Sequence, residues 1–135
     1  VHLLANSLIV ASNEDYKRAH FVLGEKERVL AVCDALVAGD YETVGQKMYE
    51  THHGLSKEYE VSCEELDFLN DVAKENGVTG SRIMGGGFGG CTINLVKDNV
   101  YDKFIADVTE KFNAKYGHAP EVYPVVISDG SHKVC

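Results

Sequence analysis

Five glycines and one phenylalanine follow one another in the stretch SRIMGGGFGGCTINLV, which covers residues 81–96. The run consists of Gly85, Gly86, Gly87, Phe88, Gly89 and Gly90. Glycine loses more backbone freedom on folding than any other residue, so the run is costly unless the chain there needs torsions or close approaches that a Cβ would forbid. Successive backbone N–H groups in such a segment can surround an anion such as phosphate. The run therefore predicts either a phosphate-binding loop or a tight turn that only permits close packing.

Three common phosphate-binding motifs do not match this run. The spacing of Gly85, Gly87 and Gly90 fits the dinucleotide-binding fingerprint, but the residues that follow alternate like a strand and do not begin the helix that this motif requires. A Walker A loop would end in Gly-Lys-Ser or Gly-Lys-Thr, whereas Gly90 is followed by Cys91 and Thr92. The V-A-I-K, H-R-D and D-F-G motifs of protein kinases are absent from the sequence. A phosphate at this run would thus be bound in another way.

Five other side chains could do chemistry, and for each a structural role is the stronger expectation. Arg82 could reach a phosphate, but an ion pair with one of the 21 acidic residues is more common for such an arginine. His52 and His53 have no further ligand at metal-binding spacing, so no metal site is predicted. Cys91 is expected to be a buried, unreactive thiol on the apolar face of a strand. Phe88 is expected to pack as a plug that fixes the run, with stacking on an adenine as the alternative.

The composition is typical of one acidic domain. With 135 residues the chain can form a single core, and one domain is expected over residues 1–135. Its net charge of −8 argues against nucleic-acid and anionic-lipid partners, and no apolar run approaches the roughly 20 residues of a membrane helix. The same charge indicates that a bound phosphate would rely on backbone N–H groups or on cations from another segment. The sequence contains no C-x-x-C pair. This favours free thiols in a reducing, cytoplasmic compartment for all four cysteines, which are Cys33, Cys63, Cys91 and Cys135.

Hydrophobic periodicity predicts several helices before and after the glycine run. Asp40 is suited to begin one of them, although Gly45 and Gly54 weaken it. Ser62 and Glu65 form a capping-box pattern at the start of the next. The pattern predicts the end of a helix at residues 1–11 and then helices over residues 14–38, 40–55, 62–76 and 99–116.

The glycine run separates two segments that read as strands. Ile83 and Met84 precede it, and residues 91–96 alternate between apolar and polar side chains. A third strand is predicted over residues 121–128, where Pro124 favours an edge position or a bulge. Helices followed by the order strand, strand, helix, strand are typical of an α+β fold.

Several segments beyond these patterns resemble one protein family. The stretch at residues 81–96 is similar to the third signature motif of galactokinases, which belong to the GHMP family of small-molecule kinases. Residues 16–29, 39–69 and 128–134 are similar to galactokinase segments in the same order, so the resemblance covers nearly the whole chain. The glycine motif indicates the GHMP family, and the stretch from Met48 to Asp67 indicates galactokinases more narrowly.

The resemblance implies the C-terminal domain of such a kinase, with a ferredoxin-like antiparallel sheet packed against helices and an N-terminal helical segment. Galactokinases transfer the γ-phosphate of ATP to the 1-hydroxyl of galactose with Mg²⁺. The Ser-rich phosphate loop and the sugar-binding signature of their N-terminal half do not occur in the 135 residues. The resemblance therefore implies that ATP, Mg²⁺ and galactose are bound mainly by an absent N-terminal domain, and that this chain alone has no catalytic residue and no kinase activity.

By the same resemblance, one wall of the nucleotide phosphate cleft between the two domains would consist of Gly85, Gly86, Gly87, Phe88, Gly89 and Gly90. Two alternatives stay open. The chain could belong to a non-catalytic sugar- or nucleotide-sensing regulator related to galactokinases, or to another GHMP kinase that acts on a different alcohol. A face that the partner domain normally covers would be exposed in the isolated chain, which predicts self-association.

Overall fold

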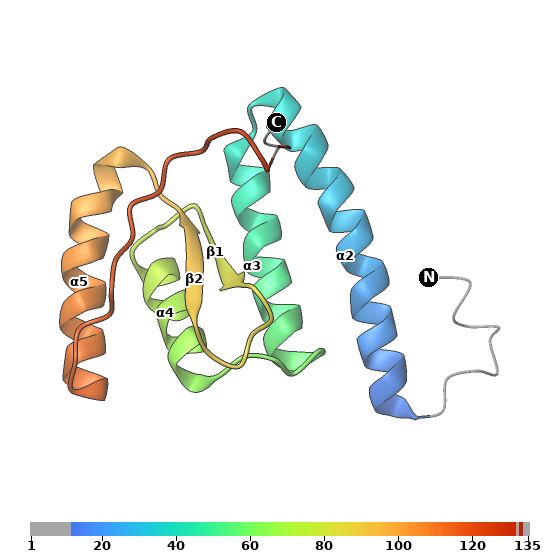
Figure 1. Ribbon diagram of the computed structural model, residues 1–135, viewed down its shortest axis with the longest axis horizontal. Helices are drawn as coiled ribbons and strands as arrows, with labels where there is room; N and C mark the ends of the chain where they lie inside the picture. The colour runs from blue at the N-terminus through green and yellow to red at the C-terminus, as the bar shows by residue number, and fades with distance from the viewer. Residues whose placement is uncertain (1–11, 132, 134–135) are drawn as a thin grey trace.

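The computed structural model describes residues 12–131 and 133, so the helix end expected at residues 1–11 lies outside the described residues. Within them the chain forms helices and one antiparallel pair of strands, which confirms the predicted α+β fold (Figure 1). None of the described helices combines the length and the apolar character that a membrane span needs. The elements are α2 (Asn13–Ala38), α3 (Tyr41–Lys57), α4 (Glu64–Glu75), β1 (Gly80–Met84), β2 (Cys91–Leu95) and α5 (Asp98–Tyr116).

The N-termini of α2 and α3 are closed by side-chain caps, whereas those of α4 and α5 are not. Asp40 caps α3 as predicted, because its carboxylate accepts a hydrogen bond from the backbone N–H of Thr43 at 3.1 Å. The capping box predicted for α4 is wrong. The N-cap is Cys63, which makes no side-chain cap bond, and the hydroxyl of Ser62 instead donates to Asp67. The side chain of Ser62 thus joins a tertiary cluster and does not close its own helix end.

The core lies between the sheet and the helices packed on one of its faces. Helices α3 and α4 both contact β1, and α4 also contacts α5 (Figure 1). Gly45 of α3 lies against Thr79, where an added Cβ would be 1.9 Å from a backbone oxygen, so this glycine permits close packing of α3 beside β1. The buried apolar side chains of this region include Leu66, Val72, Ala73, Val78, Ile83, Phe104, Val108 and Phe112.

The covered face of the sheet is not the one expected from the alternation in β2. Ile83 is only 1% exposed and pairs with Thr92, so both side chains lie on the face that the helices cover. Because side chains alternate along a strand, Cys91 and Ile93 lie on the opposite, open face. Cys91 is exposed, and the expectation of a buried thiol there is wrong. The reason is that alternation identifies two faces but does not tell which of them the helices cover.

The third strand predicted over residues 121–128 does not form. Residues 119–131 have no regular secondary structure, and Val126 and Ile127 are 90% and 99% exposed (Figure 1). Pro124 offers no backbone N–H to a neighbouring strand. A sequence with strand propensity therefore stays unpaired, and the sheet of the described residues consists of β1 and β2 alone.

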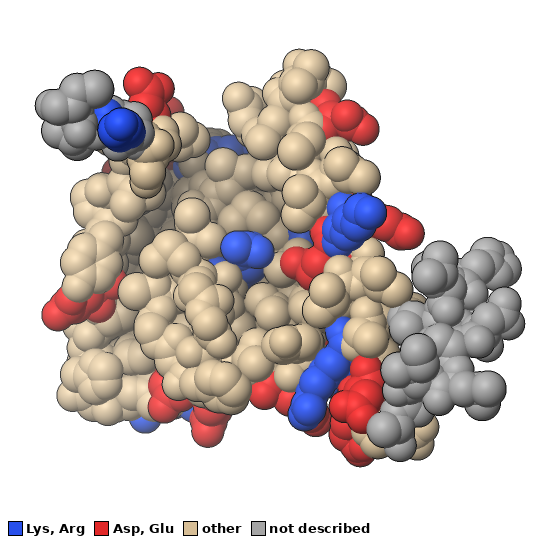
Figure 2. All heavy atoms as spheres, turned by 45° about the vertical axis from the view of Figure 1, so that its right-hand side comes forward, with Lys and Arg blue, Asp and Glu red and all other residues tan. Residues whose placement is uncertain are grey.

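Helix α2 lies at the edge of the molecule and packs on α3 through Phe21 and Ala35 (Figure 1). Many of the apolar residues that predicted this helix are exposed. In Figure 2, uncharged side chains cover most of the face turned forward, and charged side chains lie near its centre as well as at its rim. We call the exposed apolar positions of α2 the α2 stripe, and they are Tyr16, Val22, Leu23, Val29, Leu30, Leu36 and Val37.

Candidate phosphate-binding loop

The glycine loop, residues 85–90, connects β1 to β2 as predicted. Met84, the last residue of β1, pairs with Cys91, the first residue of β2, so the loop joins two directly paired strand ends. Its backbone adopts left-handed torsions that residues other than glycine rarely adopt. Positive φ angles occur at Gly85 (83°), Gly87 (82°), Phe88 (61°), Gly89 (133°) and Gly90 (91°).

One side of the loop is open. A Cβ added at Gly85, Gly86, Gly89 or Gly90 would meet no other atom within 4 Å. The main chain is therefore not covered by side chains of its own domain at these positions. Such a bare, strongly turned segment can bring its backbone N–H groups close to an anion. This is the geometry that phosphate binding by the glycine run would need.

The other side of the loop is anchored to the connection between α3 and α4. The backbone N–H of Phe88 donates to the carbonyl oxygen of Val61 at 2.7 Å. A Cβ on Gly87 would lie only 2.1 Å from the same oxygen, so no other residue fits there without displacing one of the two segments. Nothing in the local sequence pattern predicts this contact, because Val61 lies 26 positions before Gly87 and 27 before Phe88 along the chain.

The side chain of Phe88 does not act as the expected plug. It is 77% exposed, and the loop is held through the backbone of this residue. A φ angle of 61° at a residue other than glycine costs about 1–3 kcal/mol, so the contact with Val61 must offset that strain. The exposed ring of Phe88 is compatible with the alternative role named above, stacking on the adenine of a ligand.

Arg82 lies on β1, opposite Ile93 and three residues before the loop begins. The predicted ion pair is wrong, because Arg82 makes no ion pair with any acidic side chain in the described part of the chain. It is only partly buried. Its guanidinium charge is therefore not neutralised near the entrance to the loop.

His52 is a buried polar residue next to the connection that holds the loop. Its Nε2 lies 3.2 Å from Oδ1 of Asp67, whereas His53 is exposed. Burial lowers the pKa of His52, and the carboxylate of Asp67 offsets only part of this effect. Among the described residues no cluster of three His, Cys, Asp or Glu side chains could hold a metal ion.

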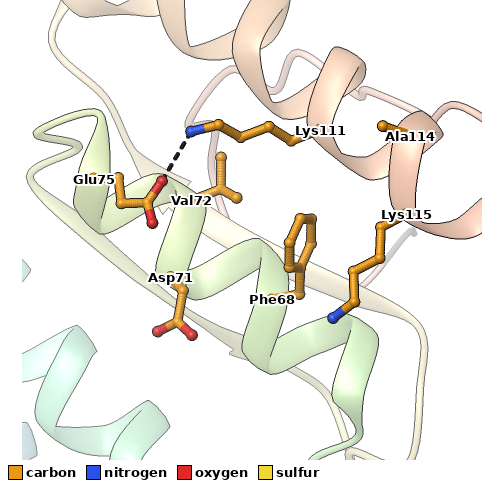
Figure 3. Close-up of a pocket in the computed structure, with 7 residues that line it drawn as sticks. All are labelled: Phe68, Asp71, Val72, Glu75, Lys111, Ala114 and Lys115. Atoms are coloured by element: carbon orange, nitrogen blue, oxygen red, sulfur yellow. Dashed lines mark hydrogen bonds and ion pairs between the residues drawn. The ribbon is translucent and has the colours of Figure 1, made fainter.

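A hollow of about 560 Å³ lies away from the loop, between α4 and α5 (Figure 3). Its cationic residues are already paired, since Lys111 lies 2.8 Å from Glu75 and Lys115 lies 2.8 Å from Glu64. No residue of the glycine loop lines it. Among the described residues that line it, the hollow therefore has no unpaired lysine with which to bind an anion, and the loop remains the better candidate site.

A family model described as "GHMP kinases C terminal" matches residues 33–114 of this chain. Among curated relatives, the galactokinase of Clostridium acetobutylicum is 39% identical over 127 residues, which cover 93% of this chain and 33% of that protein. The galactokinase of Canis lupus familiaris is 40% identical over 123 residues, which cover 90% of this chain and 30% of that protein. The chain spans about a third of the length of these relatives.

The crystal structure of Lactococcus lactis galactokinase complexed with galactose superposes with a TM-score of 0.79 at 32% identity, over 87% of this chain and 31% of that one. The L. major mevalonate kinase in complex with R-mevalonate has a TM-score of 0.58 at 22% identity, over 82% of this chain and 32% of that one, and shows the shared fold alone. Because the family model covers more than half of the sequence, the chain belongs to the GHMP kinase family and corresponds to its C-terminal domain.

Proposed function

We propose that this chain is the C-terminal domain of a galactokinase, in which the glycine loop forms one wall of the pocket for the ATP phosphates. The observation that carries the proposal is the open main chain of residues 85–90, which is fixed on one side by Val61 and bare on the other. The choice of galactose as substrate is supported by the identity to two galactokinases and the likeness to a galactokinase structure with galactose.

In the proposed reaction, the 1-hydroxyl oxygen of galactose forms a bond to the γ-phosphorus of ATP. The bond from that phosphorus to the bridging oxygen breaks, ADP leaves with this oxygen, and the hydroxyl proton passes to a base outside this chain. Phosphoryl transfer depends mainly on positioning and on neutralising charge. The loop would contribute backbone N–H groups to the phosphate oxygens, each worth about 1.5–3 kcal/mol when the acceptor is charged.

Arg82 is the cation of this domain that we place beside the phosphates, because it lies next to the loop and lacks an acidic partner among the described residues. Mg²⁺ does not fit the described side chains, since they offer no group of three potential ligands. We therefore assign the Mg²⁺ ligands, the catalytic base and most contacts with galactose to an N-terminal domain outside this chain. The free thiols of Cys33, Cys63 and Cys91 suit the proposed cytoplasmic location.

The test replaces the matching third of the Clostridium acetobutylicum galactokinase with this chain. We expect the chimera to form galactose 1-phosphate from ATP and galactose, and we expect neither this chain alone nor the truncated relative alone to do so. Arg82→Ala in the chimera should raise the KM for ATP, since one cation near the phosphates is lost, and Arg82→Lys should restore part of the affinity. The assay measures galactose 1-phosphate at varied ATP.

A folded chimera that binds ATP and galactose but transfers no phosphate would contradict the proposal and would favour the sensing regulator. Transfer by the chimera that is insensitive to every substitution in residues 85–90 would show that the loop has no part in the phosphate pocket. Phosphorylation of another alcohol in preference to galactose by the natural full-length protein would favour a different GHMP kinase.

A further inference from the structure

Three side chains near the α3–α4 connection form a polar cluster around the carboxylate of Asp67, and the more exposed Lys57 adds its Nζ at 3.4 Å from Oδ2. Ser62 donates its hydroxyl to Oδ1 of Asp67 at 2.5 Å, and Ser56 donates its hydroxyl to Oδ2 at 2.8 Å. Nε2 of His52 lies 3.2 Å from Oδ1. We call His52, Ser56, Ser62 and Asp67 the Asp67 cluster. It ties the end of α3 to the first turn of α4 and to the connection between them.

The charge state of the cluster follows from its burial and hydrogen bonds. Burial raises the pKa of Asp67, but the hydrogen bonds from Ser62 and Ser56, together with the charge and hydrogen bond of Lys57, outweigh it, so the pKa lies below its ordinary value and the group is a carboxylate. His52 is 5% exposed, and its Nδ1 has no hydrogen-bond partner among the described residues. A neutral imidazole that donates through Nε2 leaves Nδ1 as a bare acceptor, which costs less than the unpaired N–H of a charged ring.

The cluster is one residue away from the contact that anchors the glycine loop. Ser62 directly follows Val61, whose carbonyl oxygen accepts the hydrogen bond from the N–H of Phe88 at 2.7 Å. The N–H of Val61 in turn donates to the carbonyl of Leu55 at 2.9 Å. The N–H of Val61 is thus bonded to α3, and Ser62, the next residue, belongs to the Asp67 cluster. The carbonyl of Val61 points to the loop and accepts its hydrogen bond.

We infer that Ser62 and Asp67 are positioning residues for the glycine loop. The bond between them fixes the peptide that follows Val61, and with it the direction of the Val61 carbonyl that orients the peptide between Gly87 and Phe88. The role of the loop in phosphate binding rests on the proposed function, but the mechanical link from Asp67 to Phe88 does not. Neither residue is assigned a contact with substrate.

The test measures amide hydrogen exchange at Phe88 by NMR in this chain. Ser62→Ala should speed exchange at Phe88 about tenfold, because the loss of one hydrogen bond loosens the acceptor that protects this amide. Ser62→Thr keeps a hydroxyl and should restore the exchange rate. Thr43→Ala is the matched control, since it removes a hydroxyl-to-carboxylate bond of 2.6 Å to Asp40 at the other end of α3. It should leave Phe88 within about twofold of the unchanged chain.

An unchanged exchange rate at Phe88 in folded Ser62→Ala overturns the inference, and so does an equal acceleration in Thr43→Ala. Asp67→Asn should also speed exchange at Phe88, and if that variant does not fold, the Ser62 variants alone decide. In the chimera, Ser62→Ala should raise the KM for ATP several-fold and leave the KM for galactose unchanged, whereas a purely structural role would not separate the two constants. An inactive parent chimera contradicts the proposed function, and the exchange data still decide whether the cluster positions the loop.

Discussion

At the scale of single residues, Gly87 and Gly86 provide a matched pair in the loop. An added Cβ at Gly87 would lie 2.1 Å from the Val61 oxygen at a φ angle of 82°, whereas at Gly86 it would meet nothing within 4 Å. We expect Gly87→Ala to lower the free energy of unfolding by about 2–4 kcal/mol and Gly86→Ala to change it by less than about 0.5 kcal/mol. Urea denaturation monitored by circular dichroism measures both. Equal losses in the two variants would contradict the anchoring role of Gly87.

Also at this scale, His52 and Asp67 make the stability depend on pH in one direction. Both pKa values lie below the ordinary values of 6.5 and 3.8, so the unfolded chain binds protons at these groups more readily than the folded chain. The contribution of His52 is complete above pH 6.5 and is lost as the pH falls towards its lower folded pKa. Asp67 behaves in the same way below pH 3.8.

The free energy of unfolding should therefore decrease as the pH falls from 7 to 5. His52→Gln should flatten this decrease, because the amide does not titrate. His53→Gln is the control at an exposed neighbouring histidine and should keep the slope of the unchanged chain. Urea denaturation at each pH gives the comparison. A slope that persists in His52→Gln would place the titrating group elsewhere.

At the scale of elements, the segment after α5 is the part of the described chain that we expect to open first. Residues 119–131 have no regular structure, and the side chain of Ile127 is 99% exposed. Limited proteolysis should cut within this segment well before it cuts within α2 to α5, because proteases need a locally extended, unpaired chain. Mass spectrometry of early products identifies the sites. A first cut inside α3 or β1 would contradict this ordering of local stability.

The elements also show what the sequence could predict. Periodicity and end residues identified α2, α3, α4 and α5 within a few residues, because these signals are local. The alternation of Cys91 and Ile93 could not reveal which face α3 and α4 cover, since that depends on the paired residue Ile83. The strand expected at 121–128 does not form, since strand propensity alone does not fix pairing with a neighbouring strand. The glycine loop was located correctly, but its anchor at Val61 was not, because the contact is set by tertiary packing.

At the scale of the whole molecule, the α2 stripe is the feature that an isolated domain leaves uncovered. Val29 and Leu30 lie near its middle and are each 58% exposed. We propose that the N-terminal domain covers this face in the full protein and that this chain alone self-associates through it. Val29→Lys should lower the apparent mass at high concentration towards that of the monomer, whereas Val126→Lys, at an exposed site beyond α5, should not. Light scattering across a wide concentration range measures this, and a constant monomer mass in the unchanged chain would contradict it.

In the proposed function, the bare main chain of residues 85–90 contacts the phosphates of ATP. The most direct measurement is hydrogen exchange of the peptide that contains these residues, followed by mass spectrometry, in the chimera with and without a non-hydrolysable ATP analogue. We expect slower exchange in this peptide when the analogue is bound, and no such protection with galactose alone. Unchanged exchange at residues 85–90, at an analogue concentration that calorimetry shows to be saturating, would contradict the claim.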